Sequence, residues 1–487
     1  MSGTLVAGVD SSTQSCKVEL RCLDDGTRVG GGSAPHPAVH PPRSEQDPQA
    51  WWDAFVLAFA SAMDDADASA GDVAAISVAA QCHGLVVLDG ANAVIRPAKL
   101  WNDTTSAPEL HKLRRRIGDA ELVQRTGSLP TAAFTLSKVA WLARHEPANF
   151  ARAARMMLPH DYLTFRLTGR AVTDRSEASG TGYFDAAANT YLLEHLQLIA
   201  ERDWLPMLPD VLGPDECAGT VRPDVLSTLG LSGPVLVGAG GGDQHAAALG
   251  LGLEPGDLAY SFGTSGVVMC VAEQPVHDDQ GFVDGVADMT NGYLPLVSTL
   301  NAARVTDTFA RLLGTTHSEL SRLALDAPTT SAGPVLAAYL DGERKPNRPG
   351  AEGLLAGITA ETSREQLAKA AYEGVVFGLY AGQRHLERAG VETSGRVIAV
   401  GGGTRSPAYP QILADTVQKP VLGADLPEAT ARGAAVQAAA VASGRPVTEM
   451  RTRWAPSTYT LAEPQRTRLQ ARERYTRVAA IDELDRP

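Results

Sequence analysis

The chain is poor in cysteine, in long apolar runs and in positive charge, and each shortage excludes a class of protein. Its five cysteines show neither the CxxC spacing nor the spacing of a zinc site, so we expect reduced thiols rather than a disulfide framework. No apolar run approaches the roughly 20 residues of a membrane helix. The first residues, MSGTLVAGVD, lack the basic and then apolar regions of a signal peptide. We therefore expect a cytoplasmic protein without a membrane partner.

The charge balance argues against nucleic acid as a partner. The chain has 43 Lys and Arg residues against 56 Asp and Glu residues, a formal net charge of −13, whereas nucleic-acid binders carry a basic surface. A phosphate ligand is still compatible with this charge, because backbone N–H groups hold phosphates without basic side chains. At 487 residues the chain exceeds one compact core, which predicts two or three domains.

Short strand-like runs alternate with helical stretches, which predicts an α/β architecture. The clearest expected strands are residues 5–9, 73–78, 235–237 and 396–400, and the clearest expected helices are 51–63, 361–389 and 429–442. Asp47 and Pro48 form a plausible helix start before the first of these helices. The charged, proline-rich run DGERKPNRPG at 341–350 is typical of a long surface loop.

The segment 234–268 is the most informative part of the chain. An apolar strand enters a glycine cluster that ends at the carboxylate of Asp243, an Ala-rich helical segment follows, and a second strand leads into the small-residue turn at 262–266. A kinase that acts on a hydroxyl needs a proton acceptor and a turn that holds phosphates, and this segment offers both. The alternative is that Asp243 only caps the helix that begins at Gln244.

A faint internal repeat relates two hairpins. Residues 5–13 and 258–265 each form an apolar run that ends in a turn rich in small and hydroxyl side chains. Such a pair suggests a duplicated domain that holds one ligand from both sides, although strand–turn–strand likeness of this kind is common by chance. Neither glycine cluster, 238–242 or 401–403, satisfies the GxGxxG pattern of a dinucleotide dehydrogenase.

Several motifs occur together in one order along nearly the whole chain, and they resemble the FGGY family of carbohydrate kinases. These motifs are 8–10 (GVD), 81–84 (QCHG), 100–103 (LWND), 159–163 (PHDYL), 173–174 with 178–181 (TD, ASGT), 241–244 (GGDQ), 263–266 (GTSG) and 401–403 (GGG). The resemblance implies two α/β domains of ribonuclease-H-like topology, of the actin and hexokinase superfamily, flanking a deep catalytic cleft. We expect a mainly sugar-binding domain at 1–245, a mainly ATP-binding domain at 246–445 and a helical tail at 446–487.

The reaction implied by the resemblance is transfer of the γ-phosphoryl group of ATP to a sugar hydroxyl, with Mg²⁺ as the second cofactor. D-xylulose is the favoured substrate, and glycerol, ribulose and gluconate are alternatives. A non-catalytic sensor of sugar or nucleotide on the same fold is a third reading, which an intact Asp243 and two phosphate turns speak against. A homodimer is also expected from the resemblance.

The resemblance assigns roles to individual residues. Asp243 matches the catalytic base, and Asp10 matches a carboxylate near the Mg²⁺–phosphate cluster, where oxygen ligands suit a hard cation. Expected nucleotide contacts are Thr13, Gly263, Thr264, Ser265, Gly401, Gly402, Gly403 and Ser406. Expected sugar contacts are Cys82, His83, Trp101, Asn102, Asp103, Asp243 and Gln244.

Plainer interpretations stay open for several of these residues. Asp103 is as well placed to cap a following helix as to touch sugar, and an isolated His or Trp is more often structural. Lys17 is a lone basic residue on a strand, which is usually solvated. Two positions depart from the family pattern: Cys82 stands where Met is usual, and Ser12 stands where Gly is usual, which restricts positive φ in that turn.

Overall fold

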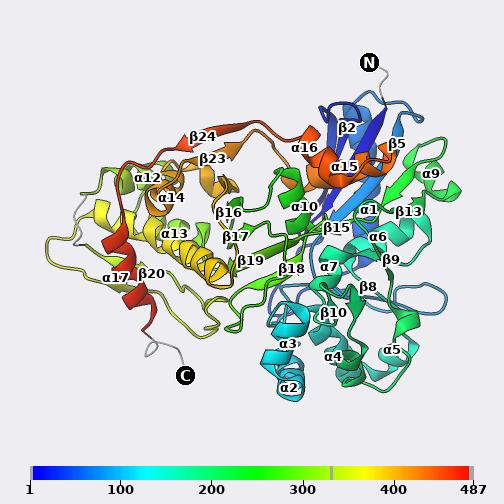
Figure 1. The fold of residues 1–487 in the computed structure, drawn as a ribbon, viewed down its shortest axis with the longest axis horizontal. Coiled ribbons are helices and arrows are strands. Elements are labelled where there is room, and N and C mark those ends of the chain that lie inside the picture. Colours follow the sequence, from blue (N-terminus) through cyan, green and yellow to red (C-terminus); the bar gives the residue numbers. More distant parts are fainter. Residues whose placement is uncertain (1–3, 329–332, 482–487) are drawn as a thin grey trace.

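The chain folds into two α/β domains, each built on a seven-stranded sheet (Figure 1). The computed structural model describes residues 4–328 and 333–481. The predicted α/β class is confirmed. In Figure 1 the first domain carries the blue and cyan elements, and the second carries the yellow and most of the orange ones.

The first sheet is centred on a strand that is buried along its whole length. Its order is β13 (Cys217–Thr220), β14 (Leu236–Gly238), β5 (Val73–Ala80), β1 (Leu5–Ser11), β2 (Ser15–Cys22) and β3 (Arg28–Pro35), and the short β15 (Gly241–Gly242) also pairs with β5. Strand β1 runs antiparallel to β2 and parallel to β5. Its sequence LVAGVDS is mostly apolar because both faces of the strand are covered.

The second sheet repeats this arrangement. Its order is β18 (Asp284–Ala287), β19 (Tyr293–Thr299), β17 (Gly266–Cys270), β16 (Leu258–Phe262), β22 (Val397–Val400), β23 (Val421–Ala424) and β24 (Thr458–Ala462). Strand β16 is antiparallel to β17 and parallel to β22, as β1 is to β2 and β5. The outer pairs also correspond, because β14 is parallel to β5 and β23 is parallel to β22. The two similar hairpins of the sequence therefore occupy equivalent places in two sheets of one topology.

Helices accompany both sheets. In the first domain, α1 (Pro48–Asp65) and α6 (Pro159–Thr168) pack on the sheet. The other helices of this domain are α2 (Ala107–Ile117), α3 (Asp119–Thr126), α4 (Thr135–His145), α5 (Pro147–Arg152), α7 (Arg175–Ser179), α8 (Leu193–Gln197) and α9 (Pro223–Leu229), and α2 to α4 lie away from β2 and β5 in Figure 1. In the second domain they are α11 (Ala303–Leu312), α12 (His317–Asp326), α13 (Arg364–Arg388) and α14 (Ala408–Val417). The predicted start of α1 is confirmed, because the Asp47 side chain accepts a hydrogen bond of 2.9 Å from the backbone N–H of Gln49.

Helix α15 (Ala429–Ser443) is late in the sequence but packs on the first sheet, against β1, β5 and helix α10 (Asp243–Gly250). Figure 1 shows it beside β2 and β5. Glycines allow this close packing: a Cβ atom on Gly8 would collide with the carbonyl oxygen of Ala431, and one on Gly433 would collide with that of Ala246. The small alanine side chains of α15 likewise allow the helix to pack closely on the sheet.

The structure differs from the expected domain limits in two places. Helix α10 runs through the expected boundary between residues 245 and 246. The tail expected to be helical contains α16 (Val447–Arg453), which packs on α15, then strand β24, and then α17 (Leu469–Ala479) beside β20 (Val335–Ala337). Residues 482–487 of that tail lie outside the described residues. Within residues 4–328 and 333–481, no helix combines the length and apolar character that crossing a membrane requires.

Candidate active site

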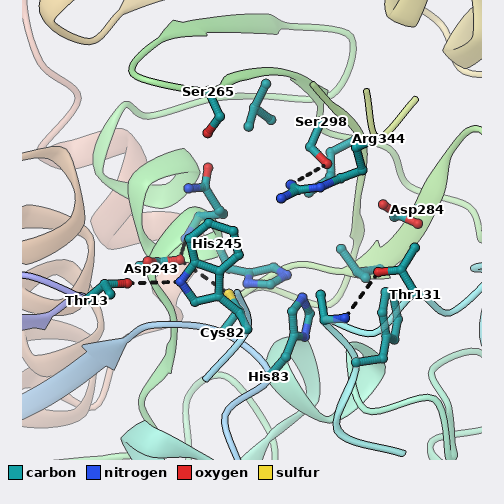
Figure 2. A pocket seen from close by; sticks show the side chains of 17 residues that line it. Thr13, Cys82, His83, Thr131, Asp243, His245, Ser265, Asp284, Ser298 and Arg344 are labelled. Carbon is teal, nitrogen blue, oxygen red and sulfur yellow. Dashed lines mark hydrogen bonds between the residues drawn. The ribbon is translucent and has the colours of Figure 1, made fainter. Parts of the chain in front are cut away.

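A cavity of about 200 Å³ lies between the two domains and is lined from both sides. This finding agrees with the predicted cleft. The wall from the first domain includes Thr13, Cys82, His83, Trp101, Phe134, Asp243, Gln244 and His245. The wall from the second domain includes Ser265, Asp284, Ser298 and Arg344. In the close-up of Figure 2, Thr13, Cys82 and His83 lie opposite Ser265, Ser298 and Arg344.

Asp243 is the first residue of α10, directly after the glycine cluster. The N-cap position belongs to Gly242, so Asp243 is not the cap that its position after a glycine turn suggested. Its Oδ1 accepts hydrogen bonds from the backbone N–H of Gln244 at 2.8 Å and from the thiol of Cys82 at 3.3 Å. Burial raises the pKa of Asp243 to about 6, partly offset by these two donors. A carboxylate with that pKa is suited to accept a proton near neutral pH.

Helix α15 holds the glycine cluster in place. The Oε1 of Gln437 accepts hydrogen bonds from the backbone N–H of Gly240 at 2.8 Å and from the hydroxyl of Ser77 at 2.6 Å. Gly240 has a φ of +88°, and a Cβ there would lie 2.7 Å from the carbonyl oxygen of Val78. Only glycine fits this position, which sets the direction in which Asp243 leaves the turn.

Thr13 and Trp101 form a polar link on the cavity wall. The indole N–H of Trp101 donates to the Thr13 hydroxyl at 2.9 Å, and that hydroxyl donates to Oε1 of Gln81 at 3.3 Å. Thr13 was expected to face phosphates, whereas its hydroxyl here joins the first hairpin to Trp101. Both side chains still line the cavity.

His83 is held in one orientation by its backbone and its ring. It has a φ of +64°, its N–H donates to Oε2 of Glu177 at 2.9 Å, and its carbonyl accepts from the Thr135 hydroxyl at 3.0 Å. The ring stacks on Phe134 with centroids 4.9 Å apart. Burial lowers the pKa of His83 to about 3, so the ring is neutral and offers one donor and one acceptor.

Asp103 and Asn102 are not among the residues that line the cavity. Asp103 is fully buried and accepts hydrogen bonds from the Lys99 ammonium and the Thr105 backbone N–H, each at 2.9 Å. The following helix α2 has Ser106 at its N-cap, so both interpretations of Asp103 are corrected. The residue instead fixes the turn that carries Trp101 into the cavity.

Arg344 is a cavity residue that the sequence did not reveal. Its Nη1 donates to the hydroxyl of Ser298 at 3.1 Å, and its guanidinium carbon lies 5.5 Å from the ring centroid of Trp101. It belongs to the run 341–350, which was expected to be a surface loop. The next residue back, Glu343, is 4% exposed and accepts hydrogen bonds from Leu300 and Asn301. These contacts turn the loop inward, and a proline-rich charged sequence contains no signal for them.

The first hairpin carries a buried carboxylate near Asp243. Burial is the main cause that raises the pKa of Asp10 to about 7; the Ser12 hydroxyl, which donates to Asp10, lowers it, and the charge of Asp243 raises it further. Ser12 is not among the residues with positive φ, so this turn forms without the glycine that is usual there. The ammonium group of Lys17, a residue whose role the sequence left open, pairs with Glu428 at 2.7 Å.

The expected nucleotide contacts of the second domain form one group. Gly401 has a φ of +90°, and a Cβ there would lie 2.8 Å from the carbonyl oxygen of Phe262, so the glycine triplet lies against the end of β16. Thr264 is exposed, and Ser265 lines the cavity. The Ser406 hydroxyl lies 2.9 Å from the hydroxyls of both Ser321 and Tyr372, donating one hydrogen bond and accepting the other, which anchors the segment after the triplet.

Comparison with known proteins identifies the family. Residues 5–250 match the N-terminal domain of the FGGY family of carbohydrate kinases, and residues 258–442 match its C-terminal domain. A xylulose kinase from Streptomyces rubiginosus is 41% identical over 456 residues, 93% of this chain and 91% of that protein. The crystal structure of xylulose kinase from Bifidobacterium adolescentis aligns with a TM-score of 0.87 and 36% identity, covering 98% of this chain and 99% of that one.

A more distant structure shares the fold. The gluconate kinase from Lactobacillus acidophilus aligns with a TM-score of 0.89 at 22% identity, covering 98% of this chain and 96% of that one. Taken with the domain matches and the cavity between the two sheets, these relationships settle the family. The chain belongs to the FGGY family of carbohydrate kinases, which use ATP to phosphorylate a sugar.

Proposed function

We propose that the protein transfers the γ-phosphoryl group of ATP to D-xylulose and forms D-xylulose 5-phosphate. The observation that carries the chemistry is the Asp243 carboxylate on the wall of the interdomain cavity, with its pKa raised to about 6. The choice of sugar is supported by the 41% identity to a protein named xylulose kinase. Other sugars remain the second candidate, because the fold is shared with a gluconate kinase.

Asp243 acts as the general base. As the sugar hydroxyl attacks the γ-phosphorus, the O–H proton passes to the Asp243 carboxylate, the new O–P bond forms, and the bond to the ADP oxygen breaks. Phosphoryl transfer requires alignment and charge neutralisation more than covalent assistance. Gln244 and Cys82 hold Oδ1 of Asp243, which leaves its other carboxylate oxygen for the substrate.

Asp10 is the side chain best suited to hold Mg²⁺. Its carboxylate is 4% exposed, and its pKa is raised by burial and by the charge of Asp243. A divalent cation would offset both the loss of solvation and the repulsion from Asp243. Oxygen ligands match this ion. When bound, Mg²⁺ neutralises charge on the nucleotide phosphates. The turn 263–266 and the glycine triplet 401–403 offer backbone N–H groups to the nucleotide.

The remaining cavity side chains suit a polyhydroxylated ligand. Neutral His83 supplies one donor and one acceptor, Arg344 supplies donors from the second domain, and Trp101 supplies an apolar face. Because Arg344 and Trp101 belong to different domains, a sugar bound between them would contact both.

A coupled assay of ADP release tests this proposal. With Mg²⁺-ATP, we expect D-xylulose to give the highest kcat/KM in a panel that also contains ribulose, glycerol and gluconate. Asp243→Asn should lower kcat by about 10²- to 10⁴-fold, the range of a general base, while ADP still binds by calorimetry. The matched control is Asp284→Asn, which removes a carboxylate from the opposite wall of the same cavity and should act mainly on KM.

The outcomes separate the alternatives. A higher kcat/KM for another sugar would replace xylulose but keep the kinase. No turnover on the whole panel, with sugar or nucleotide still bound, would favour a sensor. Loss of ADP affinity in Asp243→Asn would contradict its role as base. The homodimer stays a prediction, which sedimentation measures independently.

A further inference from the structure

Three side chains able to bind a metal ion meet beside Asp243. Cys82 follows strand β5, Glu177 belongs to α7, and His245 lies in the first turn of α10. One ligand atom from each lies within 4.8 Å of the other two. These three residues, here called the CEH cluster, come from three separate segments, so their meeting is a product of the fold and not of a local sequence motif.

The CEH cluster contains buried polar atoms whose bonding capacity is not used. His245 is 2% exposed and Glu177 is 0% exposed. Within the part of the chain that the structure describes, neither ring nitrogen of His245 has a hydrogen-bond partner, and neither does Oε1 of Glu177. Buried side-chain polar atoms are nearly always paired, so an orphaned histidine facing an orphaned carboxylate oxygen calls for a ligand.

Gly242 shows that the three ligand atoms point to one place. A Cβ atom on this residue would lie 2.5 Å from Nδ1 of His245, 2.8 Å from Sγ of Cys82 and 2.8 Å from Oε1 of Glu177. Bonds from zinc to nitrogen, oxygen and sulfur are about 2.0 to 2.3 Å long. An ion would lie further out than this Cβ position, which is one bond from the Cα of Gly242, and the absence of a side chain at 242 leaves the space between the three atoms open.

We propose that the CEH cluster binds one borderline-soft divalent cation, of the Zn²⁺ or Co²⁺ type, through Cys82 Sγ, Glu177 Oε1 and His245 Nδ1. Thiolate, imidazole and carboxylate ligands match zinc chemistry, whereas Mg²⁺ requires an oxygen shell. Three protein ligands leave a fourth position open, as at catalytic rather than structural zinc sites. Cys82 and His245 both line the cavity, so that position faces the cavity.

Binding replaces protons by the metal. The S–H bond of Cys82 breaks, a bond from sulfur to the metal forms, and the proton leaves to solvent; a protonated Glu177 likewise releases its proton. The His245 ring is already neutral, because burial lowers its pKa to about 4, and its lone pair is available.

Metal binding has a consequence for the proposed kinase reaction. The Cys82 thiol donates to Oδ1 of Asp243 at 3.3 Å, and a metal-bound sulfur has no proton to donate. Oδ1 of Asp243 then loses a contact that positions it, and an ion on Cys82 and His245 with its fourth ligand in the cavity occupies space beside Asp243 that the sugar would need. Occupancy of the CEH cluster therefore inhibits phosphoryl transfer. This consequence rests on the proposed function, but the metal site itself does not.

Cobalt binding tests the site without sugar or nucleotide. Titration of the reduced, metal-free protein with Co²⁺ should give a single site, a thiolate-to-cobalt charge-transfer band and visible bands of low-symmetry four-coordinate cobalt. Cys82→Ser, Glu177→Gln and His245→Gln should each weaken the affinity by about 100-fold or more, because loss of a direct ligand exceeds the 10- to 100-fold effect of outer-shell changes. The matched control is Cys217→Ser, which removes an exposed thiol and should change neither spectrum nor affinity.

The inhibition is measured separately, as the ratio of activity with and without Zn²⁺ for each protein at saturating Mg²⁺-ATP. We expect about a tenfold loss or more for the parent protein and almost none for His245→Gln relative to its own basal rate. Absence of the charge-transfer band, or equal cobalt affinity in the three variants and the parent, would overturn the metal site. The CEH cluster would then be a set of side chains that only hydrogen-bond with one another. Cobalt binding without zinc inhibition would retain the site and overturn its effect on catalysis.

Discussion

The β1–β2 hairpin and the β16–β17 hairpin hold equivalent places in the two sheets, yet they present different chemistry to the space between the domains. The first hairpin carries the buried carboxylate of Asp10, and the Thr13 hydroxyl bonded to Trp101. The second ends in Gly263, Thr264 and Ser265, of which Thr264 is exposed. One copy of the repeat therefore presents a charged side chain, and the other presents small side chains.

The surroundings of the two hairpins explain this difference. Strand β1 is fully buried under α15, with Gly8 against the backbone of Ala431, so a carboxylate at its end is desolvated and gains from a cation. The turn after β16 lies against the glycine triplet 401–403, where short side chains allow a ligand to approach the backbone. The two copies of the fold thus differ in chemistry through what packs behind each of them.

The largest expected effect contrasts the charged turn with the uncharged one. Asp10→Asn removes the proposed oxygen ligand of Mg²⁺ and should lower kcat by about 100-fold or more, since a metal ion supplies several kcal/mol of transition-state stabilisation. Thr264→Ala in the other turn should raise KM for ATP only a few-fold. Steady-state kinetics over a magnesium titration measure both, and equal losses in the two variants would remove the distinction between the hairpins.

The second test concerns packing behind the hairpins. Gly8→Ala places a Cβ against the carbonyl oxygen of Ala431 and 2.5 Å from the backbone nitrogen of Ala435, atoms that cannot move without shifting α15. We expect a loss of about 1 to 3 kcal/mol in the free energy of unfolding, the usual cost of overpacking. The control, Gly266→Ala in β17, meets side-chain atoms of Thr299 and Leu379 at 2.8 and 2.9 Å. Urea denaturation should show the smaller loss there.

The third test is the pH dependence of the base. Because burial raises the pKa of Asp243 to about 6, protonation below that pH removes the proton acceptor. We expect kcat/KM for the sugar, at saturating Mg²⁺-ATP, to fall up to about tenfold per pH unit below pH 6. The residual activity of Asp243→Asn should lack this limb, and a variant profile with the same limb would assign it to another group.

The smallest expected effect concerns Lys17 on β2. Its ion pair with Glu428 is 2.7 Å long, with both side chains 35% exposed, and pairs of this exposure contribute less than about 1 kcal/mol. Lys17→Ala should therefore change the unfolding free energy by less than that and leave KM for ATP nearly unchanged. A large rise in that KM would mean that the lysine serves the phosphates instead.

The sequence allowed the α/β class and most strand positions to be predicted, because apolar runs such as 5–9 and 396–400 end at polar or glycine-rich turns. Helix α15 could be predicted as a helix but not as a cover for the first sheet. Its partners, Gly8 and α10, lie far from it in the sequence, and their fit depends on glycines that show no pattern before folding.

The site residues likewise fall into two groups, those that local motifs predict and those that they do not. Asp243, Cys82, His83, Trp101 and Gln244 were predicted from local motifs and all line the cavity. Asp103 belongs to the same motif as Trp101 but points into the protein, because Lys99 and Thr105 bind its carboxylate. Arg344 and His245 had no comparable signal, since an arginine in a charged run and a histidine in an Ala-rich helix both have commoner explanations.

The packing of α15 on the first sheet also bears on how the chain is made. Synthesis proceeds from the amino terminus, so β1, β2 and β5 leave the ribosome long before residues 429–443, which cover one face of their sheet. During that interval the nascent first domain exposes the apolar surface that Ala434, Ala438 and their neighbours later bury. We expect the amino-terminal half to depend on protection from aggregation until α15, which ends at residue 443 of 487, has been translated.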